Sequence, residues 1–265
     1  MSGELLAQAV ALLLFPGVVS ILVFGLVVEG GARALLGAPD GRGLLREMRG
    51  GVRRLAPLGV GGALLLALGT TQVAVPLSPV PPGEHTLLVA IGALAAGGWL
   101  LWLLAGAGIV AGRILLLAQV TWAIALLAPA LASGSLLPVQ LGVTTLPPQV
   151  AARVAAGVAY LVALPGLLLL AEREDRFSAG GQVVRMLSWA PQTGLFASLV
   201  LPSLRANAAG VLLFALICVG ASAVAVIVAV PLRRRPELLQ RAYPRVLAAL
   251  AFIALVLGIL ATYLP

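Results

Sequence analysis

The sequence predicts an all-α, polytopic membrane protein: about eight transmembrane helices and a short amphipathic cytoplasmic helix, forming a single integral membrane domain over residues 1–265. Composition is the first reason. Hydrophobic residues make up 61% of the chain, charged residues 10%, and mean hydropathy is +1.12, whereas soluble domains are about 45–50% apolar and 25% charged. The second reason is that apolar runs of about 20 residues, enough to cross a bilayer, recur along the whole chain.

Four spans are predicted in the first half of the chain. Pro16 and Gly17 predict a kink in the first span, and the second ends in a proline-rich turn with His85, which is expected to be solvated. A tight AGAG turn follows the third span, and Arg113, just before the fourth, is expected to extend to the membrane surface. These spans cover residues 5–28, 57–75, 86–104 and 114–131.

The connector between the first two spans is the most basic part of the chain. Within residues 41–55, apolar residues recur at helical spacing on one face and arginines occupy the other. This pattern predicts a short amphipathic helix that lies along the membrane surface. The arginines of this connector are Arg33, Arg42, Arg46, Arg49, Arg53 and Arg54.

Four more spans are predicted in the second half. An uncharged, proline-broken loop over residues 133–149 is expected to fold back onto the helices, and a loop of mixed charges over residues 171–186 follows the fifth span. The sixth span contains Pro191 and Pro202 and is marginal in length. A basic connector, RRRPELLQRAYPR, joins the last two. The four spans cover residues 150–170, 187–204, 208–230 and 246–264.

The arginines fall on one side of this eight-span arrangement. All basic residues are arginines, and only Arg153 and Arg205 lie on the sparse side. By the positive-inside rule, the crowded side is cytoplasmic and both termini lie outside the cell membrane. Nucleic acid is not an expected partner, because the arginines lie in short loops beside apolar spans. The crowded side carries Arg33, Arg42, Arg46, Arg49, Arg53, Arg54, Arg113, Arg173, Arg176, Arg185, Arg233, Arg234, Arg235, Arg241 and Arg245.

The residue inventory predicts no catalytic residue and no metal site. A lone Cys218 cannot form a disulfide within the chain, and a lone His85 cannot form a multi-histidine site. Polar side chains at membrane depth usually bond a neighbouring helix, and this is expected for Gln72, Gln119, Thr121 and Gln192. The tryptophans are expected to act as interface anchors or packing residues.

Two acidic positions have open interpretations. Glu29 lies at the end of the first span, where it is either a solvated boundary residue paired with Arg33 at i+4 or a carboxylate that faces an internal polar cavity. An ionised carboxylate costs about 2.5–3.5 kcal/mol at mid-bilayer and less at a span end. The same two interpretations, a solvated loop end or part of a cavity lining, are open for the cluster of Glu172, Glu174 and Asp175 with Arg173 and Arg176.

Three segments resemble the NuoH family, the membrane subunit that contacts the quinone-reducing arm of respiratory complex I, and its relatives in membrane-bound hydrogenases. After the first span, RALLGAPDGRGLLREMRGGVRRL resembles the family's arginine-rich surface-helix segment. LLLLAEREDRFSAGGQVVRMLSWAPQTGLFASLVLPSLRAN is similar to its span-five exit: an alanine–glutamate pair, a nearby arginine and a long polar loop, ending in a short span and an alanine–asparagine pair. RRRPELLQRAYPRVLAAL is similar to the connector before its final helix.

The resemblance implies a membrane-anchoring subunit of a complex I-like NADH:quinone oxidoreductase or an energy-converting hydrogenase complex. In such a complex the chain binds no redox cofactor, its partners are peripheral iron–sulfur subunits and other membrane subunits, and quinone is a candidate ligand at their interface. Glu29, Arg33, Glu172 and Arg176 would border the quinone cavity. Candidate docking residues for the redox arm are Arg42, Arg46, Arg49, Arg53, Arg54, Arg233, Arg234 and Arg235.

The sequence also departs from the family pattern. Arg46, Glu47 and Met48 stand where the family has glutamine and then proline or an aromatic residue, and SAGGQVVRM replaces a run of carboxylates. Because a proton path needs titratable groups within hydrogen-bond reach of one another, reduced proton coupling is expected. Two alternatives stay open: a stand-alone permease or lipid-handling membrane protein, and a purely structural subunit.

Overall fold

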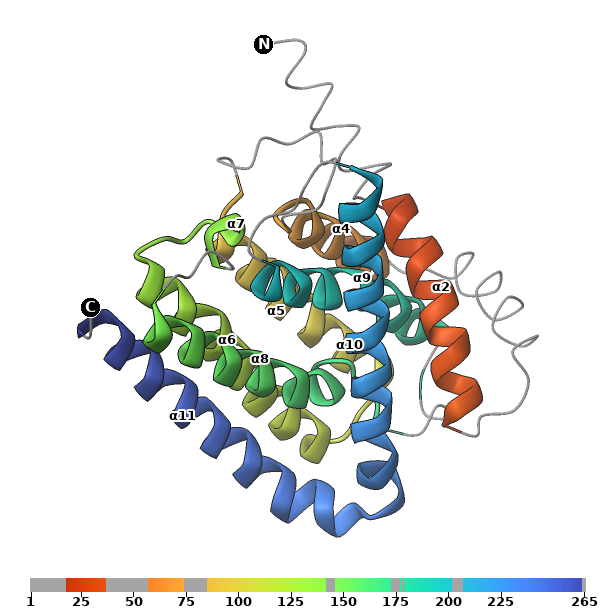
Figure 1. The fold of residues 1–265 in the computed structure, drawn as a ribbon. Coiled ribbons are helices and arrows are strands. Elements are labelled where there is room, and N and C mark those ends of the chain that lie inside the picture. The colour runs from red at the N-terminus through yellow and green to blue at the C-terminus, as the bar shows by residue number, and fades with distance from the viewer. Residues whose placement is uncertain are drawn as a thin grey trace.

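The computed structural model describes residues 18–36, 57–73, 85–141, 146–172, 177, 179–201 and 207–263, and within these ranges the chain is all-helical. Figure 1 shows the arrangement and the helix labels. The helices are α2 (Val18–Leu35), α4 (Pro57–Thr71), α5 (Leu87–Ala105), α6 (Ile109–Ser133), α7 (Pro138–Leu141), α8 (Pro147–Leu167), α9 (Ala179–Val200), α10 (Ala208–Arg234), a π-helical turn η3 (Leu238–Ala242) and α11 (Tyr243–Tyr263).

Five of the described helices are long and apolar enough to cross a membrane. They are α5, α6, α8, α10 and the continuous η3–α11 helix. The predicted membrane class is therefore confirmed. Each of the eight predicted spans overlaps one helix, but in the part of the chain that the structure describes α2, α4 and α9 are not among the five, so the count of eight stays a prediction. The predicted Pro16 kink and the amphipathic helix over 41–55 lie outside the described residues.

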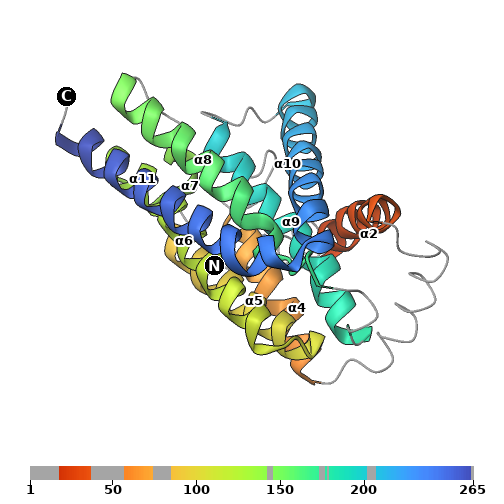
Figure 2. The same ribbon diagram turned by 90° about the horizontal axis from the view of Figure 1, so that it is seen from below.

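Helices α6, α8 and α11 form one group that lies side by side in both views (Figures 1 and 2). Small residues allow close approach: a methyl group at Gly258 on α11 would lie 2.7 Å from the Cβ atom of Ala128 on α6. Tyr243, at the start of α11, donates its hydroxyl proton to the carbonyl of Val162 (2.7 Å) and accepts from the amide of Gly166 (3.1 Å). These bonds tie α11 to the end of α8.

Helix α9 is the centre of the second group, because it packs against α2, α4, α5 and α10 (Figure 2). Its side chains are almost all buried between residues 181 and 199. This burial in protein explains why α9 carries Gln182, Arg185, Ser188 and Gln192 without meeting the composition of a lipid-facing span. The sequence predicts a span that begins at residue 187, but the helix begins at Ala179. It therefore includes Arg185, which the sequence predicts to lie in a loop.

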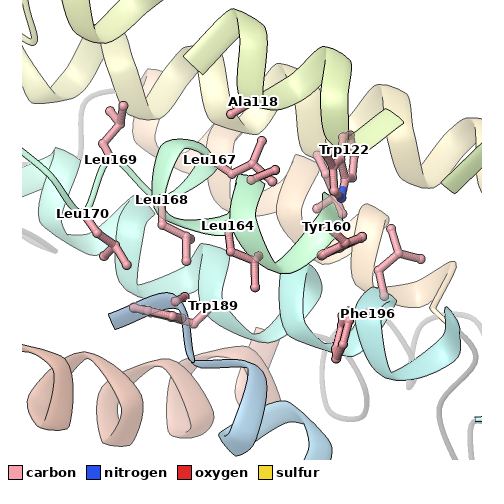
Figure 3. Packing of buried hydrophobic residues seen from close by; sticks show 14 of the residues in the cluster. Ala118, Trp122, Tyr160, Leu164, Leu167, Leu168, Leu169, Leu170, Trp189 and Phe196 are labelled. Carbon is pink, nitrogen blue, oxygen red and sulfur yellow. The ribbon is translucent and has the colours of Figure 1, made fainter. Parts of the chain in front are cut away.

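A compact apolar turn ends α8 and joins the two groups (Figure 3). Helix α8 stops at Leu167, Leu169 adopts a left-handed conformation (φ 50°), and the amide of Leu170 donates to the carbonyl of Pro165 (2.9 Å). Leu167 to Leu170 are all buried. Earlier in α8, Tyr160 packs between the rings of Trp122 and Phe196. The centre of its ring lies 6.3 Å from that of Trp122 and 5.5 Å from that of Phe196. This core fixes the position of α9 relative to α8.

Several polar expectations can be checked directly. Gln119 donates to the carbonyl of Ala95 on α5 (2.9 Å), and Thr121 donates to the carbonyl of Leu247 on α11 (3.2 Å), so interhelical bonding is confirmed for both. The loop after α6 folds back as predicted, because α7 packs on α9 with Leu141 fully buried. The solvated setting expected for His85 is wrong: only 2% of this residue is exposed.

The helix ends that flank the arginine-rich connectors lie together at one end of the molecule. The end of α2 meets the start of α9 through Arg33 and Gln182. The start of α9 also meets the end of α5, because a methyl group at Gly181 would lie 3.0 Å from the amide nitrogen of Ala105. The start of α11 meets the end of α8 through Tyr243. We call this end of the molecule the arginine-rich end.

Candidate functional site

A buried charge cluster at the arginine-rich end is the candidate site. The Glu29 carboxylate, with no exposed surface, accepts from four N–H donors. Its Oε1 atom accepts from Arg33 Nε (3.1 Å), from Arg185 Nε (3.1 Å) and from Arg185 Nη2. Its Oε2 atom accepts from Trp189 Nε1 (2.9 Å). A carboxylate offers about four lone-pair sites, two on each oxygen, so Oε1 is fully occupied and Oε2 accepts one bond from the described residues. We call Glu29, Arg33, Arg185, Trp189 and Gln182 the Glu29 cluster.

Helical spacing places the members of the cluster opposite one another. Glu29 and Arg33 are one turn apart on α2, and Arg185 and Trp189 are one turn apart on α9, so each pair shares a face. Gln182, one turn before Arg185, accepts from Arg33 Nη2 (2.8 Å) and closes the cluster at the helix ends.

Gly25 brings the two helices close enough for this contact. It lies one turn before Glu29, and a methyl group at this position would collide with the backbone carbonyl oxygen of Met186 on α9. Gly30, on another side of α2, has no described atom within 4 Å of the corresponding point. The requirement for glycine is therefore specific to the α2–α9 contact.

The electrostatics of the cluster are those of a desolvated ion network. Arg33 and Arg185 are only 6% and 2% exposed, and the Arg185 guanidinium lies 4.6 Å from the centre of the Phe177 ring, within the range of a cation–π interaction. Burying such charges costs several kcal/mol per ion, and this cost is offset only when geometry and hydrogen bonding are good. The carboxylate has lost its water and depends on the two guanidinium groups.

The sequence left two settings open for Glu29, and its burial excludes the solvated one. The predicted i+4 pair with Arg33 is confirmed, but the carboxylate faces the protein interior. The carboxylate on α2 is bound by guanidinium groups from both α2 and α9. Bound by two guanidinium groups and an indole N–H, the carboxylate is suited to holding α2 and α9 together.

Glu172 has a separate setting. It is half-buried just after α8 and lines a cavity of about 10 Å³ together with Tyr243, Leu239 and Leu232. A cavity of about this volume holds about one water molecule. It is too small for a quinone ring, since an engineered cavity that binds benzene is about 150 Å³. Its lining joins the end of α8 to α10, η3 and α11.

Some of the remaining candidate arginines lie in the described residues and the others lie outside them. Arg233 is half-buried at the end of α10, whereas Arg234 and Arg235 are exposed. In the described ranges, no three or more histidine, cysteine or acidic side chains lie close enough together to hold a metal ion. Six candidate arginines lie outside the described residues: Arg42, Arg46, Arg49, Arg53, Arg54 and Arg176.

Sequence reasoning missed the α9 half of the cluster. Gln182, Arg185 and Trp189 follow one another at spacings of three and four residues, which is the signature of one helical face. That spacing, together with Gly25 and Glu29 one turn apart on α2, was the available signal. The pairing itself joins residues 156 positions apart, which local spacing does not specify.

Comparisons with protein-family models, curated proteins and solved structures found no match to this chain.

Proposed function

We propose that this chain is the membrane-anchoring subunit of a complex I-like NADH:quinone oxidoreductase or an energy-converting hydrogenase complex. Its arginine-rich end would face the cytoplasm and dock peripheral iron–sulfur redox subunits, with both termini outside the cell membrane. The chain itself would hold no redox cofactor, and quinone would bind at its interface with the partner subunits.

The Glu29 cluster is the observation that carries this proposal. It joins the end of α2 to the start of α9, and these are the described parts of two of the three segments that resemble the NuoH family. The third segment begins at the end of α10 and runs into α11, which Tyr243 ties to the end of α8. Segments far apart in the sequence thus meet at one end, as an arm-docking surface requires.

A docking subunit needs a rigid base beneath its charged connectors. Buried ion networks are costly to break once formed, with about 3–5 kcal/mol lost when one partner is removed. Such a network at the α2–α9 contact would hold the end of α2 in a fixed relation to the start of α9. The arginines would then supply charge complementarity to the partner, which raises association rates and selects the partner.

In this proposal the chain itself contributes few groups to proton coupling. Glu29 is held by two guanidinium groups and an indole N–H, and Glu172 lines a space for about one water molecule. A continuous proton path would need further titratable groups within hydrogen-bond reach. We infer that this subunit anchors the arm and that partner subunits supply most of the quinone-binding and ion-translocating groups.

Co-purification from the native membrane tests the proposal. The tagged full-length chain, extracted in mild detergent, should bring down a subunit with bound iron–sulfur clusters, detectable by iron content and by electron paramagnetic resonance. The triple variant R233Q/R234Q/R235Q should lower recovery of that subunit. The control R153Q changes a charge expected on the opposite side and should leave recovery unchanged. Isolation of the wild-type chain alone would contradict the proposal and favour a stand-alone permease or lipid-handling protein.

A second experiment separates a cavity-bordering role from pure scaffolding. If the purified complex reduces quinone, E172Q should lower that rate without changing subunit recovery. An unchanged rate, with all subunits present, would favour the structural alternative, in which this chain only holds the arm to the membrane.

A further inference from the structure

A second polar site lies at the same end of the molecule, away from the Glu29 cluster. It is a groove of about 340 Å³ between the start of α6 and the η3–α11 helix. Arg113, Gln240 and Arg241 supply its polar groups, and Ile114, Leu117 and Pro244 supply apolar lining. We call it the α6–α11 groove. Nothing in the anchoring role proposed above requires it.

The groove concentrates positive charge. Arg113 and Arg241 come from different helices, are both exposed, and line one cavity without an acidic residue among its lining. The acid closest along this helix is Glu237, which is exposed one turn before Arg241 and does not line the groove. Two guanidinium groups and an amide form a donor set suited to a phosphate, since arginine binds phosphate oxygens in a bidentate manner.

The position of the groove restricts the source of that phosphate. Arg113 lies one turn after the start of α6, and Arg241 lies in the first turn of the η3–α11 helix, and both helices are apolar enough to cross the membrane. The groove therefore lies where these spans leave the bilayer, at the level of lipid head groups.

An exposed apolar stripe continues from the groove along α6. Leu116 and Val120 follow Arg113 at i+3 and i+7, on the same side of the helix, and are 50% and 47% exposed. A charged head-group site followed by an apolar stripe that runs into the membrane matches the two chemistries of a phospholipid. Free phosphate would use only the first.

We propose that the α6–α11 groove binds the head group of an anionic phospholipid, with Arg113 and Arg241 on its phosphate, Gln240 as an added donor, and an acyl chain along Leu116 and Val120. Basic pockets between transmembrane helices on the cytoplasmic side are suited to anionic lipid head groups. The bound lipid would join α6 to α11 at the surface where their ends meet.

Lipid binding to the full-length purified chain tests the proposal. Delipidated protein is placed in nanodiscs of phosphatidylcholine with increasing phosphatidylglycerol, and bound lipid is measured with a fluorescent phosphatidylglycerol probe and by native mass spectrometry. Losing a hydrogen bond to a charged group weakens binding by at least about tenfold, so R113Q/R241Q should weaken phosphatidylglycerol binding by at least about tenfold. Retention of phosphatidylcholine should not change.

The control R234Q/R235Q removes the same charge from exposed positions at the same end but outside the groove. It removes only general surface attraction, so it should weaken binding clearly less than R113Q/R241Q does. Equal losses in both variants would mean a general surface attraction and would overturn the site. So would an unchanged affinity in R113Q/R241Q, competition by inorganic phosphate at millimolar concentration, or tighter binding of a polyglutamate peptide than of lipid. Circular dichroism verifies folding, and single R241Q provides the same comparison if the double variant does not fold.

Discussion

Replacing Glu29 with glutamine should destabilise the α2–α9 contact far more than a surface substitution would. The amide keeps the size of the carboxylate but removes its charge, so the guanidinium groups of Arg33 and Arg185 lose the anion that both bind. Glu29 and Arg185 are 0% and 2% exposed, so water cannot screen the change. Breaking a buried ion pair in this way costs about 3–5 kcal/mol, and E29Q should lower the free energy of unfolding by that amount.

A double-mutant cycle isolates the pair. R185Q alone should cost a similar amount, because it leaves the carboxylate with one guanidinium, whereas E29Q/R185Q removes both charges. The double variant should therefore be less destabilised than the sum of the singles by about 2–3 kcal/mol. Unfolding is followed by circular dichroism during sodium dodecyl sulfate titration of the protein in mild detergent micelles.

The same cycle gives a clear refutation. An E29Q variant within about 0.5 kcal/mol of wild type, the range of ordinary surface substitutions, would mean that the carboxylate is solvated. Additive single and double variants would mean that Glu29 and Arg185 do not interact. Either result would remove the basis for a rigid α2–α9 base.

Three further predictions concern named contacts. Gly25→Ala should destabilise the protein by about 1–3 kcal/mol, because the added methyl collides with α9, whereas Gly30→Ala should be neutral or stabilise by up to about 1 kcal/mol in the same titration. Trp189→Phe should cost about 1.5–3 kcal/mol, since it removes a donor to a buried carboxylate; the exposed Trp99→Phe is the control, and equal effects would contradict the bond. Tyr243→Phe should cost about 1–3 kcal/mol and speed amide exchange at Gly166, and unchanged exchange there would argue against the α8–α11 link.

Hydropathy located the helices well because it reports contact with lipid. Each predicted span overlaps one helix, and the largest departures occur where protein replaces lipid. The sequence predicts the start of α9 as a loop because residues 179–186 include Gln182 and Arg185, yet these side chains form hydrogen bonds with Arg33 and Glu29 on α2. Helix α6 begins at Ile109, earlier than predicted, since an arginine near a helix end can extend to the surface.

Only the α2 half of the Glu29 cluster could be predicted from the sequence. The i+4 pair on α2 follows from spacing, but the contribution of Arg185 requires knowing that Gly25 admits the backbone of Met186. That is a tertiary fact with no local periodicity. The same holds for His85, which lies in a connecting segment and is nevertheless buried. Loop position predicts solvation on average, and packing overrides it here.

Sidedness of the connectors tests the central claim, a cytoplasmic arginine-rich surface, most directly. In a C218S background, single cysteines at Arg46, Glu174 and Pro236 are labelled in right-side-out and inverted vesicles with a membrane-impermeant maleimide, and Asn207→Cys reports the opposite side. All three connector positions should react only from the cytoplasmic side and Asn207→Cys only from outside. Labelling of Arg46→Cys and Glu174→Cys from opposite sides would contradict the account, since no common docking surface would then exist.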